Sequence, residues 1–195
     1  VHAAMAALDG KKPAKLVALG GGSVIDTAKA AAILLADDDL DYEEVQWRRA
    51  TITKGSLPLI AVPTTAGTGS EMTHVTVIGD SKGFKMGVVH EAVFTNAAIL
   101  DGNLMLSLPA KLTAATGMDA LVHAIEAYLG KRANPTTDMY ALTAIKAVTC
   151  WLPEATKNGS NLKARQEMAQ AAAWGGMSMD QAGLGLVHSL AGPLC

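Results

Sequence analysis

The chain has 195 residues, of which 50% are hydrophobic and 17% are charged, and its formal net charge is −2. This composition excludes an intrinsically disordered chain and leaves ample length for a hydrophobic core. Because there is no basic footprint and no uncharged run of roughly 18 residues, we expect neither a nucleic-acid partner nor a membrane partner. Only Cys150 and Cys195 occur, without a metal or redox spacing, so we expect a reduced, cytoplasmic setting.

The first predicted elements are a strand, a glycine turn and a helix. In KLVALGGGSVIDTAKAAAILLA (residues 15–36), the apolar run 16–19 predicts a short strand, and the alanine-rich stretch after the glycines predicts a helix. Ser23 can cap this helix, and Asp26 follows as an acid that favours its positive end. Residues 36–44, ADDDLDYEE, then predict an acidic surface loop.

Further short strands follow along the chain. Residues 57–71, LPLIAVPTTAGTGSE, predict a strand that runs into a loop rich in proline, threonine and glycine. Residues 72–80 and 85–89 predict the two strands of a hairpin, joined by a turn over 79–83. Residues 98–109 predict one more short strand and a loop.

The sequence changes in character near Pro109. From this residue onward the periodicity is helical, with interruptions at KRANPTTD, WLPEATKNGSN and WGGMS. We therefore expect an α/β part over residues 1–107, followed by an all-helical part over residues 108–195.

The glycine turn is a candidate phosphate site. Gly20 to Gly22 leave backbone N–H groups free at the positive end of a helix, although such turns serve as often for steric reasons alone. The G-x-G-x-x-G spacing is missing, and Asp39 and Asp41 lie in the acidic loop rather than at a strand end, so we reject a standard Rossmann fingerprint. The hydroxyl-rich loop 64–70 follows another strand end, and two such loops together favour a nucleotide cradle.

A second set of polar residues lies in the apolar run AATGMDALVHAIEAYLG. Asp119 and His123 are four residues apart, so their side chains share one helix face. A buried, unpaired carboxylate would cost several kcal/mol, so Asp119 is expected either to pair with the histidine or to bind a metal. His188 could supply a second imidazole, and an Asp–His–His set suits iron, zinc, manganese or cobalt with an open position for a substrate oxygen.

The remaining polar residues are less specific. Glu126 could brace a metal ligand, or it could face solvent or a neighbouring charge. Lys29 and Lys85 could meet a phosphate or a ribose, but a solvated surface position is the better expectation for both. His74 and His90 fit half-exposed strand or loop positions.

Four segments carry a family resemblance that extends over nearly the whole chain. They are GGGSVIDTAKA, PTTAGTGSEMT, LTAATGMDALVHAIEAY and GLVHSLAGPL, in this order. The chain resembles the iron-containing, metal-dependent alcohol dehydrogenases, for which the third segment is highly specific. Glycerol dehydrogenases and dehydroquinate synthases share the fold but fit these segments less well.

The resemblance implies a fold and a set of site residues. Residues 1–107 would be part of a Rossmann-like domain that binds NAD or NADP, and residues 108–195 part of a helical domain that holds a divalent metal, Fe²⁺ in preference to Zn²⁺. Substrate would lie in the cleft between them, and the protein would be a homo-oligomer, a dimer or larger. The implied cofactor residues are Gly21, Gly22, Ser23, Asp26, Thr64, Thr65, Thr68, Lys85 and Leu112, and the implied metal ligands are Asp119, His123 and His188.

Three features depart from the family pattern. Family members are nearly twice as long, and the chain begins at Val1 and stops in an apolar run, so we expect a fragment that lacks the first strands. The family's fourth metal ligand, a histidine, would lie beyond the last residue. Gly192 stands where the family usually has a histidine near the substrate.

The leading functional hypothesis is a metal-dependent oxidoreductase. It would transfer a hydride between a small primary alcohol, or its aldehyde, and NAD(P), with the metal as a Lewis acid toward the alcohol oxygen. One alternative is a non-catalytic fragment with only a nucleotide-binding or assembly role. Another is a same-fold glycerol dehydrogenase or an enzyme similar to dehydroquinate synthase.

Overall fold

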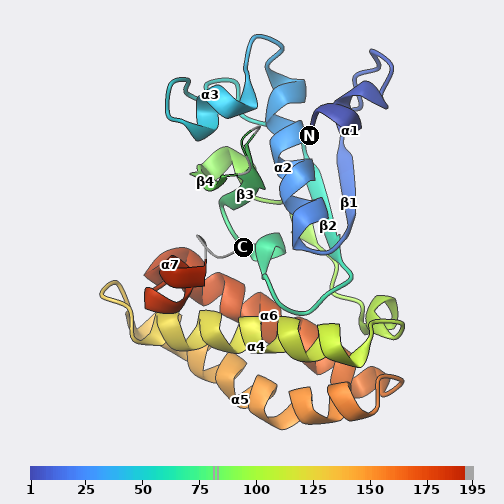
Figure 1. The fold of residues 1–195 in the computed structure, drawn as a ribbon, viewed down its shortest axis with the longest axis vertical. Coiled ribbons are helices and arrows are strands. Elements are labelled where there is room, and N and C mark those ends of the chain that lie inside the picture. Colours follow the sequence, from blue (N-terminus) through green and yellow to red (C-terminus); the bar gives the residue numbers. More distant parts are fainter. Residues whose placement is uncertain (81, 83, 192–195) are drawn as a thin grey trace.

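The computed structural model describes residues 1–80, 82 and 84–191, so the predictions that involve Gly83, Gly192 and Cys195 lie outside the described residues. An α/β part and a helical part are stacked along the long axis of the molecule (Figure 1). The elements in chain order are α1 His2–Ala6, β1 Leu16–Gly20, α2 Gly22–Ala36, α3 Tyr42–Gln46, β2 Leu59–Pro63, the 3₁₀ turn η1 Ser70–Met72, β3 Val75–Gly79, β4 Lys85–Val89, η2 Glu91–Val93, β5 Ala97–Ala98, η3 Gly102–Met105, α4 Ala110–Tyr128, α5 Pro135–Lys157, α6 Leu162–Ala182 and α7 Leu186–Ala191.

A parallel three-stranded sheet in the order β1-β2-β5 forms the centre of the α/β part. β2 is the middle strand, which accounts for its continuous apolar sequence LIAVP. α2 packs on β1 and β2, where Ile25 fills a small core with Ala18 and Leu59. Because Gly20 pairs with Pro63 in the parallel register, the glycine turn and the hydroxyl-rich loop leave the sheet at the same edge.

The predicted hairpin is present as a separate two-stranded sheet. β3 and β4 pair antiparallel from Val75 opposite Val89 to Gly79 opposite Lys85. Its Val88 joins a second core with residues of α2 and α3. The prediction of an acidic loop over residues 36–44 was wrong at its end, where α3 begins at Tyr42. Asp41 caps this helix, because its side chain accepts a hydrogen bond from the Glu44 N–H at 3.1 Å.

Three long helices, α4, α5 and α6, pack side by side beneath the sheet (Figure 1). Their contact faces are rich in alanine, which lets the helices approach closely, and Met168 is 2% exposed at the centre of this core. Asn134 begins α5 with a capping box that it shares with Thr137. Arg165 of α6 is buried and donates to the Leu108 carbonyl, which ties the bundle to the chain entering α4.

Ser23 does not cap α2, because the helix already begins at Gly22 with Gly21 as the N-cap residue, so Ser23 lies within the first turn.

Over the described residues, none of the helices combines the length and the apolar sequence that a bilayer crossing requires.

Candidate metal and cofactor site

A cleft of about 580 Å³ lies where the α/β part meets the helical part. β3, β4 and the loop before η1 line one side of it, and α4, the end of α6 and α7 line the other. Most predicted site residues with ionisable side chains border this space. The lining residues with charged or imidazole side chains are Asp26, His74, Lys85, Asp119, His123, Arg132, Asp180 and His188.

The three predicted metal ligands converge in this cleft. Ligand atoms of Asp119, His123 and His188 all lie within 4.8 Å of one another. Oδ1 of Asp119 is 3.6 Å from Nε2 of His123 and 3.5 Å from Nε2 of His188, and the two imidazole rings stack with centroids 4.5 Å apart. The i, i+4 spacing on α4 therefore brings two of these groups together, and α7 delivers the third.

The remaining ring nitrogens of both histidines are held by oxygen acceptors. Nδ1 of His188 donates to Oε2 of Glu126 at 2.5 Å, and Nδ1 of His123 donates to the Gly67 carbonyl at 3.3 Å. Each neutral imidazole then presents the lone pair of Nε2 toward Asp119, which is the tautomer that a metal ligand requires. Three electron-pair donors facing one another form a set that fits a divalent cation such as iron or zinc.

Glu126 answers a question that the sequence left open. It is 9% exposed, and besides His188 its carboxylate accepts the Val187 N–H at 2.6 Å through Oε1. Burial acts to raise the pKa of Glu126, but these hydrogen bonds outweigh burial and hold the pKa below its usual value. Glu126 therefore stays ionised and anchors both the start of α7 and the ring orientation of His188.

The pKa shifts around the three groups reflect their mutual contact. Burial lowers the pKa of His123, so its neutral form is favoured. Burial acts to raise the pKa of Asp119, but the contact with His188 and the charge of His123 outweigh it and lower the pKa. The contact of Nε2 with the Asp119 carboxylate in turn raises the pKa of His188, which favours the protonated form of this ring. The carboxylate is thus kept as the anion that cation binding needs.

The structure brings the glycine turn and the hydroxyl-rich loop into contact. A Cβ atom at Gly21 would lie 3.3 Å from Oγ1 of Thr65, and one at Gly22 would lie 2.6 Å from Cγ2 of Thr68. Glycine at these two positions therefore lets the turn lie close to the threonine side chains and leaves its backbone uncovered. Thr64 begins the loop, and its N–H donates to the Gly20 carbonyl at 2.9 Å.

The other predicted cofactor residues are dispersed around these two loops. Ser23 is exposed in the first turn of α2, and Lys85 is exposed on β4 at the rim of the cleft. Leu112 is 44% exposed on the first turn of α4, one turn before Thr116, whose side chain backs Gly67.

Asp26 borders the cleft, and each of its carboxylate oxygens accepts a hydrogen bond from the protein. Oδ1 accepts from Oγ of Ser70 at 2.6 Å, and Oδ2 accepts from the Val77 N–H at 3.0 Å. Burial raises the pKa of Asp26, while these hydrogen bonds oppose the shift. In the structure Asp26 therefore joins α2 to the segment between η1 and β3.

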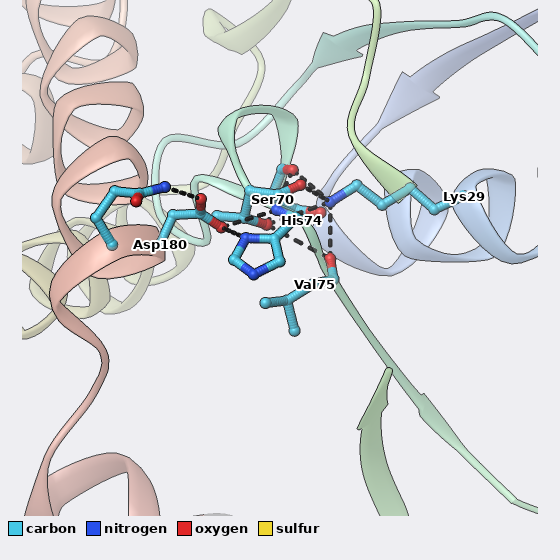
Figure 2. A network of polar contacts seen from close by, with 7 residues as sticks. Lys29, Ser70, His74, Val75 and Asp180 are labelled. Atoms are coloured by element: carbon cyan, nitrogen blue, oxygen red, sulfur yellow. Dashed lines mark hydrogen bonds and ion pairs between the residues drawn. The ribbon is translucent and has the colours of Figure 1, made fainter. Parts of the chain in front are cut away.

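Lys29 contradicts the expectation of a solvated surface lysine. It is 0% exposed, and Nζ donates to the carbonyl oxygens of Ser70 at 2.7 Å, Thr73 at 2.8 Å and Val75 at 2.7 Å (Figure 2). The sequence carried a signal for this position, because Lys29 continues the buried stripe of Ile25 by four residues along α2.

His74 is half-exposed, as the sequence predicted, and it also contacts the helical part of the chain. One carboxylate oxygen of Asp180 in α6 accepts two hydrogen bonds from His74, one from the backbone N–H at 2.8 Å and one from ring Nδ1 at 2.5 Å (Figure 2). Gln181 donates to the second oxygen of this carboxylate at 2.9 Å. The His74–Asp180 pair joins the two parts of the chain at the cleft wall. Because the two residues are 106 positions apart, no short-range sequence pattern could predict this contact. His90 keeps a local role, since its Nδ1 accepts the Ala92 N–H at 3.1 Å.

Glu71 is a buried carboxyl group that makes the stability of the fold depend on pH. It is 3% exposed behind the hydroxyl-rich loop, and burial raises its pKa to about 7 from the ordinary 4.5. A raised carboxyl pKa means that the folded state binds more protons than the unfolded state between these two values. The contribution of Glu71 to the free energy of unfolding is therefore fully present below pH 4.5 and is lost, by roughly 3 kcal/mol, as pH rises through about 7.

Urea unfolding between acidic and neutral pH tests this dependence against Glu71→Gln. The wild-type chain should lose stability relative to the variant as pH rises, because glutamine has no proton to lose. Glu91→Gln, at an exposed carboxylate, serves as the matched control and should run parallel to wild type. Parallel curves for wild type and Glu71→Gln would contradict the prediction.

Comparison with known proteins places this chain in a family. The sequence matches the family described as iron-containing alcohol dehydrogenase over residues 1–102, and the C-terminal model of the Fe-containing alcohol dehydrogenase family over residues 113–195. It is 47% identical over 178 residues to the NAD-dependent methanol dehydrogenase of Bacillus methanolicus, an alignment that covers 90% of this chain and 46% of that protein.

Solved structures give the same result. The sulfoacetaldehyde reductase of Bifidobacterium kashiwanohense, determined in complex with NAD⁺, is 36% identical and superposes with a TM-score of 0.93 over 99% of this chain and 51% of its own. An iron-containing alcohol dehydrogenase of Thermotoga maritima is 38% identical with a TM-score of 0.90, over 99% and 52% of the two chains. The chain thus spans about half the length of the relatives it matches, and it belongs to the iron-containing alcohol dehydrogenase family.

Proposed function

We propose that this protein is a metal-dependent oxidoreductase that transfers a hydride between a small primary alcohol, or its aldehyde, and NAD(P). The observation that carries the proposal is the convergence of Asp119, His123 and His188 in a cleft beside two loops of bare backbone and hydroxyl groups. The B. methanolicus relative is named for NAD-dependent methanol oxidation, which agrees with this chemistry.

Each group of residues has a defined task in this proposal. Asp119, His123 and His188 would hold the metal, and Glu126 would keep His188 in the required tautomer. When bound, a divalent metal acts as a Lewis acid toward the alcohol oxygen and lowers the pKa of the hydroxyl group. Both histidines are at least half-buried, so the chain excludes water from much of the coordination space.

The cofactor would lie across the sheet edge. Gly21, Gly22 and Ser23 would hold the pyrophosphate at the N-terminus of α2, and Thr64, Thr65 and Thr68 would donate from the facing loop. Asp26 would act through this loop, which it holds by Ser70, whereas Lys85 and Leu112 would contact the cofactor from the two sides of the cleft. The cofactor would supply the redox chemistry, and the protein the orientation.

The finer features of the proposal follow the family resemblance. We propose Fe²⁺ as the metal, with Zn²⁺ as the alternative, and either NAD or NADP as the cofactor. A cytoplasmic location and a homo-oligomer, a dimer or larger, complete it. The proposed domain division remains residues 1–107 for the cofactor and residues 108–195 for the metal.

A turnover assay with and without metal tests the function. Protein stripped with a chelator should not reduce NAD⁺ or NADP⁺ in the presence of methanol, ethanol or 1-propanol, and reloading with Fe²⁺ under anaerobic conditions should restore the reaction. Glycerol as the preferred substrate would favour the same-fold glycerol dehydrogenase. Metal and cofactor binding without turnover on any alcohol would favour the non-catalytic alternative, and turnover that persists in the stripped protein would contradict the metal-dependent mechanism.

A further inference from the structure

The ammonium group of Lys29 is a buried charge whose partners are all neutral oxygens. Its three N–H groups are matched by three backbone carbonyls, and Oγ1 of Thr73 lies a further 3.2 Å from Nζ. Among the described residues, no carboxylate forms an ion pair with it. Burying such a charge is expensive, and the hydrogen bonds from Nζ offset part of this cost.

The carbonyls that Lys29 holds belong to the end of the hydroxyl-rich loop and the chain that follows it. The loop is fixed at its start by the bond from the Thr64 N–H to Gly20, and at its end by Ser70, which bonds to both Asp26 and Lys29. All of these anchors lie on β1 or α2, the unit that carries the glycine turn. Lys29 therefore fixes the loop against the turn without itself facing the cleft.

The same lysine supports the wall of the cleft. Thr73 and Val75, whose carbonyls it holds, flank His74, and His74 is the residue that Asp180 clamps from α6 (Figure 2). The hydrogen bonds thus run without a break from the proposed cofactor helix α2, through the segment before β3, to the helix that precedes His188.

We propose that Lys29 is a positioning residue for the dinucleotide: its three bonds to the chain over residues 70–75 hold the hydroxyl-rich loop at the separation from the glycine turn that cofactor binding needs. This inference rests on the proposed function, because it presumes that the two loops bind NAD(P). It assigns the role to a residue that touches neither the cofactor nor the substrate.

The role depends on the charge of the lysine. Burial lowers the pKa of Lys29 to about 8, and the carboxylates that face it, Asp26 of α2, Glu71 of η1 and Asp180 of α6, oppose the shift. Above this pH the neutral amine has two N–H groups for three carbonyls, so one carbonyl loses its donor. The loop should then loosen, and cofactor affinity should fall as pH rises through about 8.

The test compares Lys29→Met with wild type by calorimetric titration of NAD⁺ from neutral to alkaline pH. Methionine keeps the length of the side chain but donates no hydrogen bond. At neutral pH the variant should bind NAD⁺ about tenfold more weakly, the equivalent of one charge-assisted hydrogen bond. Wild-type affinity should fall at alkaline pH, whereas the affinity of the variant should not change. A purely structural role would not produce this difference in pH dependence.

Controls keep the inference open to refutation. Lys146→Met removes an exposed lysine from α5 and should bind NAD⁺ like wild type at every pH. If Lys29→Met fails to fold, Lys29→Gln retains a neutral donor and should bind with intermediate affinity and no alkaline loss. Wild-type affinity and pH dependence in a folded Lys29 variant would overturn the proposal.

Amide hydrogen exchange separates this inference from the proposed function. If the wild-type chain binds no NAD⁺, the cofactor assignment fails, and exchange at the His74 and Val77 amides then decides the role of Lys29. Exchange about tenfold faster in Lys29→Met, with α4 to α6 unchanged, would support the positioning role. Equal exchange in the two proteins would overturn it.

Discussion

Replacing His123 with alanine is expected to weaken divalent-metal binding by about 100-fold or more. His123 is 5% exposed and its Nε2 is one of three donors that face the proposed metal position, so its loss leaves only Asp119 and His188. A two-ligand site cannot hold the metal against water and free chelators. Metal-supported turnover should be abolished with it.

The measurement is a titration of the stripped protein with Zn²⁺ or Co²⁺, together with turnover after Fe²⁺ loading. Alanine is the best helix former, so α4 should remain intact at this position. His90→Ala is the matched control, because it removes a histidine that only caps η2 and should leave metal affinity unchanged. Undiminished activity in metal-stripped His123→Ala protein would refute the assignment of the metal site.

The cluster of Asp119, His123 and His188 could be predicted only in part from the sequence. Asp119 and His123 could be paired from helical spacing alone, because both lie on one element whose geometry is fixed. The spacing could not distinguish an acid–histidine pair from a metal site, and His188 entered as an optional third ligand. The structure adds a tertiary contact, the hydrogen bond from Nδ1 of His188 to Glu126, which turns Nε2 of His188 toward Asp119. This contact favours a metal site, and the assignment of the three ligands stays a prediction.

Lys29 shows a different limit. The sequence predicted the strand, the turn and the helix of this unit, and the structure contains all three. The lysine was assigned to the surface because lysines are rarely buried, although it occupies a core position of α2. Three backbone carbonyls from a distant segment accept the N–H groups of Lys29 and make its burial possible. The orientation of those carbonyls depends on the tertiary fold and could not be predicted from the sequence.

The α/β part and the helical part meet at two glycines. Gly69 has φ +60°, and a Cβ atom there would lie 2.7 Å from Cα of Gly176 and 2.8 Å from the Ala172 carbonyl oxygen. In the other direction, a Cβ atom at Gly176 would lie 2.6 Å from the Gly69 carbonyl oxygen. The hydroxyl-rich loop thus rests directly on the backbone of α6. The sequence placed Gly176 in WGGMS, a predicted interruption of the helix, but α6 runs through it from Leu162 to Ala182, and the glycine instead makes room for the loop.

Replacing Gly176 with valine is therefore expected to destabilise the fold by about 3 kcal/mol or more, because the clash is with backbone that cannot rotate away. Urea unfolding would measure the loss, with Gly79→Val as the matched control, since a Cβ at Gly79 meets nothing within 4 Å and should cost no more than about 0.5 kcal/mol. The displaced loop also carries the Gly67 carbonyl that holds His123, so metal affinity should fall in the same variant. An unfolding midpoint equal to wild type would show that the loop does not rest on α6.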